Sequence, residues 1–350
     1  MLQSRRMSAA ALTLRAPDDW HVHLRDGALL APLLAATARH FARAVIMPNL
    51  KPPLVTTAQV AAYRARIRAA LPPETAFEPL MTAYLTDASV PADLVAGARD
   101  GVLTAVKFYP AGATTNAQAG VTDIGRLDQV LVALASAGLP LLVHGEVTDR
   151  EVDVFDREAV FIERVLEPLR RRHPELKVVL EHITTVEAVD YVMSGEPRLL
   201  AATVTPHHLV LNRNAMFQGG LRPHYYCLPL VKRERHRAAL VAAVTRGDPH
   251  FFLGTDSAPH PRHLKEHACG CAGIYNTPVA LAVYAEVFAQ AGALAHFEAF
   301  AALNGPRFYG LPVNQRHITL TRGAPPVAAE VAGVVVFEPP QAAAWQVSAA

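Results

Sequence analysis

The sequence predicts a (β/α)₈ barrel, an α/β fold in which eight parallel strands alternate with helices. Eight short apolar runs alternate with longer segments rich in Ala, Leu and Arg over most of the 350 residues. Runs such as LPLLVHGE and KVVLEHI have no polar alternation, which is typical of strands buried on both faces. The alternative is a doubly wound open sheet. It is disfavoured because no glycine-rich nucleotide fingerprint follows an early strand.

Gly- and Pro-containing joints such as AGLP and RGDP separate the predicted strands from the helical segments. In chain order the predicted strands are residues 18–24, 42–49, 77–85, 105–110, 139–146, 177–183, 201–207 and 250–259. Helical patterns between and after them include residues 57–70, 124–137, 151–172, 234–245, 277–290 and 297–303. We therefore expect a single domain over residues 1–350, with the barrel core at about 15–312. Residues 313–350 are expected to form a decorating C-terminal tail.

Composition excludes several classes of partner. The net charge is only +2 and the basic residues are scattered, so no nucleic-acid partner is expected. No apolar run is long enough to span a membrane, and the N-terminal leader lacks the features of a secretory signal. The three cysteines, an odd and low number, do not build a disulfide framework. We therefore expect a cytoplasmic protein.

Potential metal ligands recur near the carboxyl ends of the predicted strands, where barrels of this class place their active sites. They are His21, His23, His144, His182 and Asp256. The two histidines of the first strand are two residues apart, so both side chains point the same way. One such histidine is more often an ordinary polar core residue. Several at matching strand ends, together with an aspartate, form a set that zinc prefers.

Lys107 lies inside the apolar strand AVKFYP, where a charged ammonium is costly to bury. One interpretation is an ion-paired lysine, or one whose ammonium reaches the solvent. The other is a neutral amine that has reacted with CO₂ to form a carbamate, whose two oxygens can bridge two cations. The surrounding histidines and aspartate favour the carbamate.

The sequence resembles a known family in this arrangement of residues. A HxH motif after the first strand, a lysine on the fourth, histidines on the fifth and sixth and an aspartate on the eighth form the ligand pattern of the binuclear amidohydrolase superfamily. More narrowly, the chain resembles the bacterial-type class II dihydroorotases from about Asp18 to Pro312. The motifs that carry the resemblance are PDDWHVHLRDG, AVIMPNLKPP, AVKFYPAGATTN, LLVHGEV, VVLEHITT, TPHHLVLNRN, CLPLVKRERHRAAL and LGTDSAPH.

The resemblance implies an enzyme that reversibly cyclises N-carbamoyl-L-aspartate to L-dihydroorotate and water in de novo pyrimidine (UMP) biosynthesis. It implies two Zn²⁺ ions per subunit and a homodimer. One ion would be held by His21, His23 and Asp256, the other by His144 and His182. A CO₂-derived carbamate on Lys107 and a hydroxide would bridge them. Asp256 would act as general base and then as general acid.

The resemblance also implies residues that bind the substrate and cover it. Arg25 and Asn49 would bind its carboxylate, and an arginine suits a bidentate contact of this kind. The remaining ring contacts would come from His144, His260 and the backbone of Leu228 and Ala272. Thr114 and Thr115, in the small polar loop AGATTNAQAG, would close as a lid.

Other interpretations remain open. A hydantoinase, an allantoinase or another cyclic-amide hydrolase would use the same metals, because a fold and its metals do not fix the substrate. A non-catalytic scaffold on the same barrel is the second alternative, although none of the metal ligands is missing. His207 and His208 at the end of the seventh strand, and the group of His267, Cys269 and Cys271, are weaker candidates. We expect ordinary loop residues there rather than a second metal site.

Overall fold

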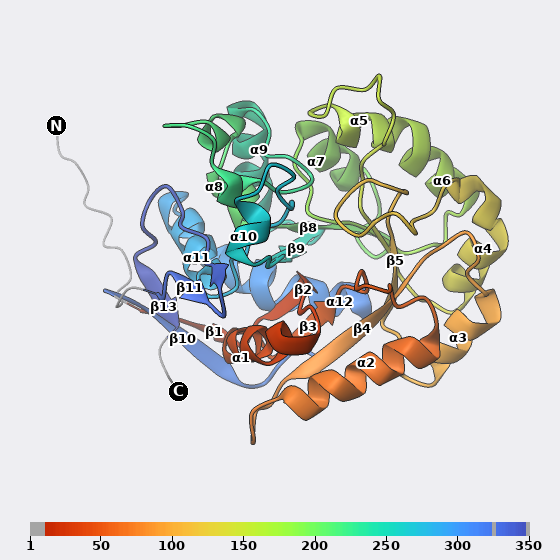
Figure 1. The fold of residues 1–350 in the computed structure, drawn as a ribbon, viewed down its shortest axis with the longest axis horizontal. Coiled ribbons are helices and arrows are strands. Elements are labelled where there is room, and N and C mark those ends of the chain that lie inside the picture. The colour runs from red at the N-terminus through yellow and green to blue at the C-terminus, as the bar shows by residue number, and fades with distance from the viewer. Residues whose placement is uncertain (1–10, 324–326, 348–350) are drawn as a thin grey trace.

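The computed structural model describes residues 11–323 and 327–347. Its centre is a parallel sheet in which each strand pairs with the next along the chain, in the order β2 to β9. These strands are β2 (Asp18–Val22), β3 (Arg43–Ile46), β4 (Glu78–Tyr84), β5 (Ala105–Phe108), β6 (Leu141–Val143), β7 (Val178–Leu180), β8 (Leu200–Val204) and β9 (Phe251–Leu253). A parallel bridge from Val22 to Ser257 joins the two ends of the sheet (Figure 1). The predicted (β/α)₈ barrel is confirmed.

Helices surround the barrel, both in the connections between its strands and after β9 (Figure 1). They are α1 (Leu30–His40), α2 (Thr57–Ala70), α3 (Pro91–Arg99), α4 (Asp128–Ser136), α5 (Arg157–Phe161), α6 (Glu167–Arg172), α7 (Val186–Met193), α8 (Pro206–Val210), α9 (Glu234–Thr245), α10 (Arg262–Lys265), α11 (Ala280–Gln290) and α12 (Asn304–Tyr309). The start of α2 is fixed by a reciprocal capping box between Thr56 and Gln59. Among the described residues, no helix is long and apolar enough to cross a bilayer.

Two strand groups lie outside the barrel. An antiparallel sheet joins β1 (Ala11–Arg15), β10 (His317–Arg322) and β13 (Trp345–Val347), and β11 (Glu330–Val331) pairs with β12 (Val334–Val335). Our sequence analysis missed β1 and β10, whose paired residues are more than 300 positions apart in the sequence. The segment predicted as a C-terminal tail therefore contacts the start of the described chain. The first ten residues of the predicted leader lie outside the described residues.

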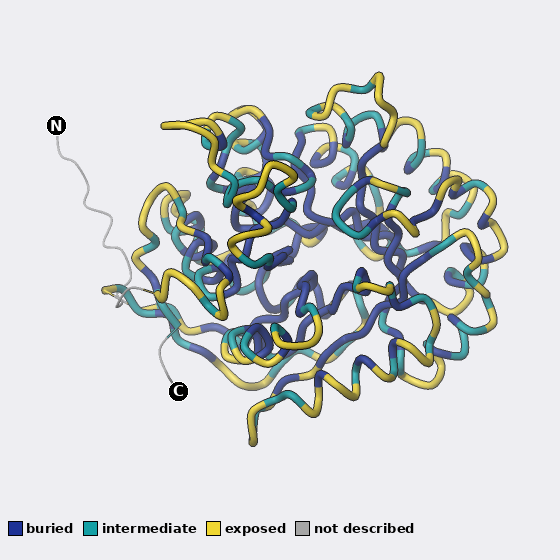
Figure 2. The backbone as a smooth tube through the Cα atoms, viewed as in Figure 1, coloured by how far each residue is buried: buried dark blue, intermediate teal, exposed yellow. Residues whose placement is uncertain are grey.

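An apolar layer fills the barrel interior and supports the polar residues at its mouth. Every barrel strand contributes one side chain to it: Trp20, Val45, Leu80, Ala105, Leu142, Val179, Ala201 and Phe252. Strand residues two positions apart point to the same face. Lys107, His144 and Glu181 therefore form the next inward layer, nearer the carboxyl ends of β5, β6 and β7. Figure 2 shows this buried centre inside helices whose outer faces are exposed.

Candidate active site

The residues predicted to form the site meet at the carboxyl ends of the barrel strands. One cavity is lined by most of them: His21, His23, Arg25, Asn49, Thr114, Thr115, His144, His182, Leu228, Asp256 and Ala272. His260 lies beside this cavity, with Nε2 3.1 Å from Nη2 of Arg25. Lys107 is fully buried, and its Nζ is 3.7 Å from Glu181, a residue that also contacts His21.

His21, His23 and Asp256 form a compact buried group of metal-ligand type. Oδ1 of Asp256 lies 3.3 Å from Nε2 of His21 and 3.1 Å from Nε2 of His23. Each ring is oriented through its other nitrogen. His23 Nδ1 is hydrogen bonded to Oδ1 of Asn49 at 2.8 Å, and His21 Nδ1 contacts the Glu181 carboxylate. Both Nε2 atoms therefore face the Asp256 carboxylate, as ligands with outer-shell partners do.

His144 and His182 bring a second pair of imidazoles to the same mouth. The His182 ring centroid is 4.9 Å from that of His144 and 5.0 Å from that of His21. His144 Nε2 is 2.8 Å from Glu146 Oε2, whereas buried Nδ1 of His182 has no hydrogen-bond partner. Burial lowers the pKa of His21 and of His182 well below its usual value. Both rings are therefore neutral, which is the form that binds a metal.

The backbone at two of these residues adopts an unusual conformation. Glu181 points inward, so simple strand alternation would turn the next residue, His182, towards the surrounding helices. The chain instead adopts φ +42° at His182 and +41° at Asp256. A hydrogen bond of 2.7 Å from His182 N to Thr203 Oγ1 holds the first of these turns. Left-handed backbone at non-glycine residues is strained and concentrates at functional sites.

Lys107 is the buried cation of the inward layer. Its Nζ has no hydrogen-bond partner and lies 3.7 Å from Oε2 of Glu181 and 4.9 Å from the ring centroid of Tyr109. Burial lowers the pKa of Lys107 to about 7. A substantial fraction of the amine is therefore neutral at physiological pH, and a neutral amine is nucleophilic.

Besides Glu146, which contacts His144, two more buried carboxylates at the site were missed by the sequence analysis. Glu181 contacts His21 and lies near Lys107. Asp19 accepts hydrogen bonds from His21 N at 3.1 Å, Thr255 N at 2.8 Å and Thr255 Oγ1 at 2.6 Å. Asp19 therefore fastens the HxH strand to the loop that carries Asp256. An acidic residue inside each apolar motif, PDDWHVH and VVLEHI, was the available signal.

Arg25 presents its guanidinium at the rim of the cavity. Its backbone φ is +58°, and its carbonyl accepts a hydrogen bond from Tyr63 Oη. Nε donates to the Pro259 carbonyl at 3.0 Å, which fixes the plane of the guanidinium while leaving further N–H groups for a ligand. Burial, aided by the Arg25 charge, lowers the pKa of His260 to about 2, so that ring is neutral.

The predicted lid lies against the site. Nδ2 of Asn49 donates to Thr115 O at 3.3 Å, and Nδ2 of Asn116 donates to Asn49 O at 3.2 Å. Thr115 Oγ1 donates to Ala272 O at 3.4 Å. Thr114 also lines the cavity. The loop therefore spans the mouth between the segments that carry Asn49 and Ala272.

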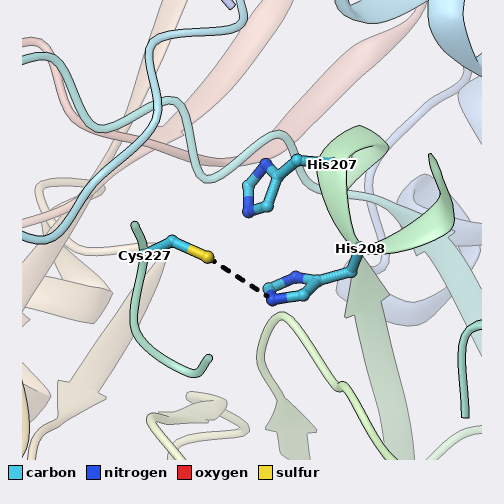
Figure 3. A group of neighbouring side chains, drawn as sticks. All are labelled: His207, His208 and Cys227. Atoms are coloured by element: carbon cyan, nitrogen blue, oxygen red, sulfur yellow. Dashed lines mark hydrogen bonds between the residues drawn. The ribbon is translucent and has the colours of Figure 1, made fainter. Parts of the chain in front are cut away.

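Figure 3 shows a second buried group, His207, His208 and Cys227. His207 was predicted to end a strand, but the Pro206 turn places both histidines in α8. His208 Nε2 lies 3.0 Å and Cys227 Sγ 3.4 Å from the Pro229 carbonyl, which accepts from both. The Asn276 amide donates to His207 Nδ1 at 3.1 Å, which leaves the ring proton on Nε2. These contacts tie α8 to the segment before Pro229, and Nε2 of His207 has no hydrogen-bond partner.

His267, Cys269 and Cys271, which were predicted to be ordinary loop residues, lie after α10. Cys269 is exposed, and its backbone N–H donates to His267 Nδ1 at 3.2 Å. In the described part of the chain, neither Cys269 nor Cys271 belongs to a group of potential metal ligands.

The donors at the mouth suit a binuclear metal centre. They are imidazole nitrogens and a carboxylate, with a buried lysine among them, and the unpaired atoms include Lys107 Nζ and His182 Nδ1. Buried polar atoms without partners are rare in native proteins, and ring and amine nitrogens of this kind at one mouth are compatible with metal binding.

Comparisons with known proteins agree with this geometry. Residues 18–315 match the amidohydrolase family. The dihydroorotase of Synechococcus sp. (strain CC9605) is 62% identical over 337 residues, covering 96% of this chain and 97% of the relative. The chain belongs to the amidohydrolase family, among the dihydroorotases. For an amidohydrolase the ligand groups at this mouth imply a binuclear metal centre.

Solved dihydroorotases share the whole architecture of this amidohydrolase. The enzyme from Campylobacter jejuni is 34% identical, with a TM-score of 0.87 over 100% of this chain and 99% of that one. The enzyme from Saccharomyces cerevisiae, solved in complex with 5-fluoroorotic acid, is 29% identical, with a TM-score of 0.89 over 97% and 99%.

Proposed function

We propose that this chain is a dihydroorotase that reversibly cyclises N-carbamoyl-L-aspartate to L-dihydroorotate and water, a step of de novo pyrimidine biosynthesis. One observation carries the proposal: a group of potential metal ligands lines the same cavity as Arg25 and Asn49, whose side chains can donate hydrogen bonds to a carboxylate. A cyclic amide that carries a carboxylate matches both halves of this site. The yeast relative's complex with 5-fluoroorotic acid supports a ring acid as the ligand.

The proposed cofactors are two Zn²⁺ ions. His21, His23 and Asp256 would hold one ion, and His144 and His182 the other. Nitrogen and carboxylate donors of this kind suit zinc. When bound, the ions supply Lewis-acid polarisation of a carbonyl and make a water molecule more acidic.

Lys107 would bridge the ions as a carbamate. The neutral amine would attack CO₂: a C–N bond forms, one C–O π bond of CO₂ breaks, and the nitrogen passes one proton to the solvent, which gives an anionic group with two oxygens. Burial of Lys107 and its pKa of about 7 support this reaction, because only the neutral amine can attack. The anionic carbamate would also offset part of the cationic charge in the buried site.

Asp256 would move the proton. In ring opening it accepts a proton from the attacking water and passes it to the departing ring nitrogen. In ring closure it begins protonated. Its position beside both His21 and His23, at 3.3 and 3.1 Å, supports a role at the reacting centre.

The substrate would be held from three sides. Arg25 and Asn49 would bind the carboxylate, with His260 beside Arg25 at 3.1 Å. The backbone of Leu228 and Ala272 would contact the ring, and His144 would also touch it. Thr114 and Thr115 would then cover the substrate and exclude water.

We further propose one domain over residues 1–350, a homodimer and a cytoplasmic location. Pairing of β10 with β1 supports a single domain, because the tail is thereby fastened to the start of the described chain. The three free cysteines support a reducing compartment.

A direct assay tests the function. Purified protein is mixed with L-dihydroorotate, loss of ultraviolet absorbance is followed, and the metal content of the same sample is measured. Turnover with about two zinc ions per chain is expected. Bound metal without turnover would indicate that the substrate is another cyclic amide, such as a hydantoin or allantoin. Absence of both, after reconstitution with zinc and bicarbonate, would favour a non-catalytic scaffold.

A further inference from the structure

Lys265 is a buried lysine whose ammonium is bound by backbone carbonyls. It ends α10, after the loop that follows β9, and it is only 4% exposed. Nζ donates to Tyr226 O at 2.9 Å, Cys271 O at 2.9 Å and Gly273 O at 2.7 Å. The three acceptors use all three ammonium protons.

This arrangement requires the charged form of the side chain. Burial lowers the pKa of Lys265 to about 8, so at neutral pH the ammonium still carries the three protons that the carbonyls accept. The Tyr226 ring lies 5.7 Å from Nζ and adds a favourable cation–π contact. A buried charge held this way is costly to leave without its partners.

The three carbonyls belong to two separate segments that both reach the cavity. Tyr226 precedes Leu228, whereas Cys271 and Gly273 flank Ala272, and both Leu228 and Ala272 line the cavity with the metal ligands. The segments also meet directly, since Gly273 N donates to Tyr226 O at 3.0 Å. Lys265 therefore holds together two walls of the same cavity.

The Ala272 carbonyl, which lies between the two carbonyls of this segment that Lys265 binds, has a different partner. Those of residues 271 and 273 accept from Lys265, but Ala272 O accepts from Thr115 Oγ1 of the lid at 3.4 Å. Gly273 has φ +145°, and a Cβ there would lie 2.5 Å from Ala258 O, so only glycine fits this close approach. Ala272 is thus presented to the cavity by fixed neighbours on both sides.

We propose that Lys265 is a positioning residue that fixes the spacing between the Leu228 and Ala272 backbones, and so the width of the ring-binding wall and the contact point of the lid. This inference rests on the proposed function, because it assigns the wall to substrate binding. Lys265 itself does not line the metal-site cavity. Loss of its three hydrogen bonds should weaken substrate binding more than the chemical step.

The test compares Lys265→Met with Lys177→Met. Methionine keeps a similar length but removes every donor. Lys177 is a matched control, since its Nζ also donates to a backbone carbonyl, Phe308 O at 3.3 Å, but at the amino end of β7, away from the mouth. For L-dihydroorotate, Lys265→Met should raise KM about tenfold or more, with a smaller change in kcat and unchanged metal content. Lys177→Met should leave KM within about twofold.

Hydrogen exchange provides a readout that does not depend on turnover. In Lys265→Met, backbone amides of residues 226–228 and 271–275 should exchange faster than in the parent protein, while β5 and β6 stay protected. If the methionine variant does not fold, Lys265→Arg keeps the charge but its planar fork does not match three converging carbonyls. The arginine variant should also show a higher KM and faster exchange in the same segments, but both changes should be smaller than in the methionine variant.

The outcomes separate this inference from the proposed function. A parent protein that does not turn over L-dihydroorotate refutes the function, whatever the variants do. With an active parent, unchanged KM and unchanged exchange in a folded Lys265 variant overturn the positioning role. A lower kcat together with lower stability and an unchanged KM also overturns it, because this result indicates a lysine with a purely structural role.

Discussion

Replacing Lys107 by alanine tests the centre of the proposed site. The substitution removes the one residue proposed to contribute to both ions. One ion then retains His21, His23 and Asp256, whereas the other retains only His144 and His182. Catalytic zinc sites use three protein ligands, so the two-histidine position should lose its ion first. We expect metal content to fall from about two ions per chain to one or fewer.

The activity should fall accordingly. An ion that polarises a carbonyl stabilises the transition state by several kcal/mol, and a loss of about 4–6 kcal/mol corresponds to a decrease in kcat of about 10³- to 10⁴-fold. Lys107 is fully buried, so alanine leaves space in the inward layer. A short carboxylate such as acetate or propionate can occupy that space and offer two oxygens. We expect it to restore part of the metal content and part of the activity.

The assay is elemental analysis of desalted protein combined with hydrolysis of L-dihydroorotate, with and without the added acid. Lys177→Ala is the control, because Lys177 lies at the opposite end of the barrel and should keep both metals and activity. Thermal unfolding confirms that both variants are folded. A Lys107→Ala protein that keeps about two ions and its full rate would refute the bridging carbamate.

Four further predictions follow from the same geometry. At a fixed concentration of dissolved CO₂, reactivation of metal-free protein by zinc should accelerate as pH rises through about 7, because burial lowers the pKa of Lys107 to about 7 and only the neutral amine reacts; a rate independent of pH between 6 and 8 would contradict this. Ring opening should be favoured at higher pH and ring closure at lower pH, since Asp256 begins as a base in one direction and as an acid in the other; identical profiles in the two directions would exclude that role. Asp19→Ala leaves the buried backbone N–H groups of His21 and Thr255 without an acceptor and should lower the free energy of unfolding by about 2–6 kcal/mol in urea titrations, whereas Asp100→Ala, at an exposed ion pair, should change it by less than about 0.5 kcal/mol. Arg25→Met should raise KM for L-dihydroorotate about 10- to 100-fold, as expected when a charge-assisted carboxylate contact is lost; an unchanged KM would remove Arg25 from the carboxylate site.

The sequence by itself determined the fold class and grouped most of the residues that line the cavity. The strands of a parallel barrel are buried on both faces, so they are continuous apolar runs that can be recognised in the sequence. All eight predicted strands are present. A parallel barrel also brings the carboxyl ends of its strands together. Residues at those ends, from His21 to Asp256, could therefore be grouped before any distance was known.

Tertiary structure alone decided how these residues face one another. Strand periodicity places Glu181 inward and His182 outward, and only a backbone φ of +42° brings the histidine to the mouth. The hydrogen bonds of Asp19 to Thr255 join residues more than 200 positions apart, as does the pairing of β1 with β10. No local pattern encodes such contacts. The contacts of Asp19 with Thr255 form only when closure of the barrel brings its first and last strands together, and this also places the Asp256 carboxylate against the two histidines of the first strand.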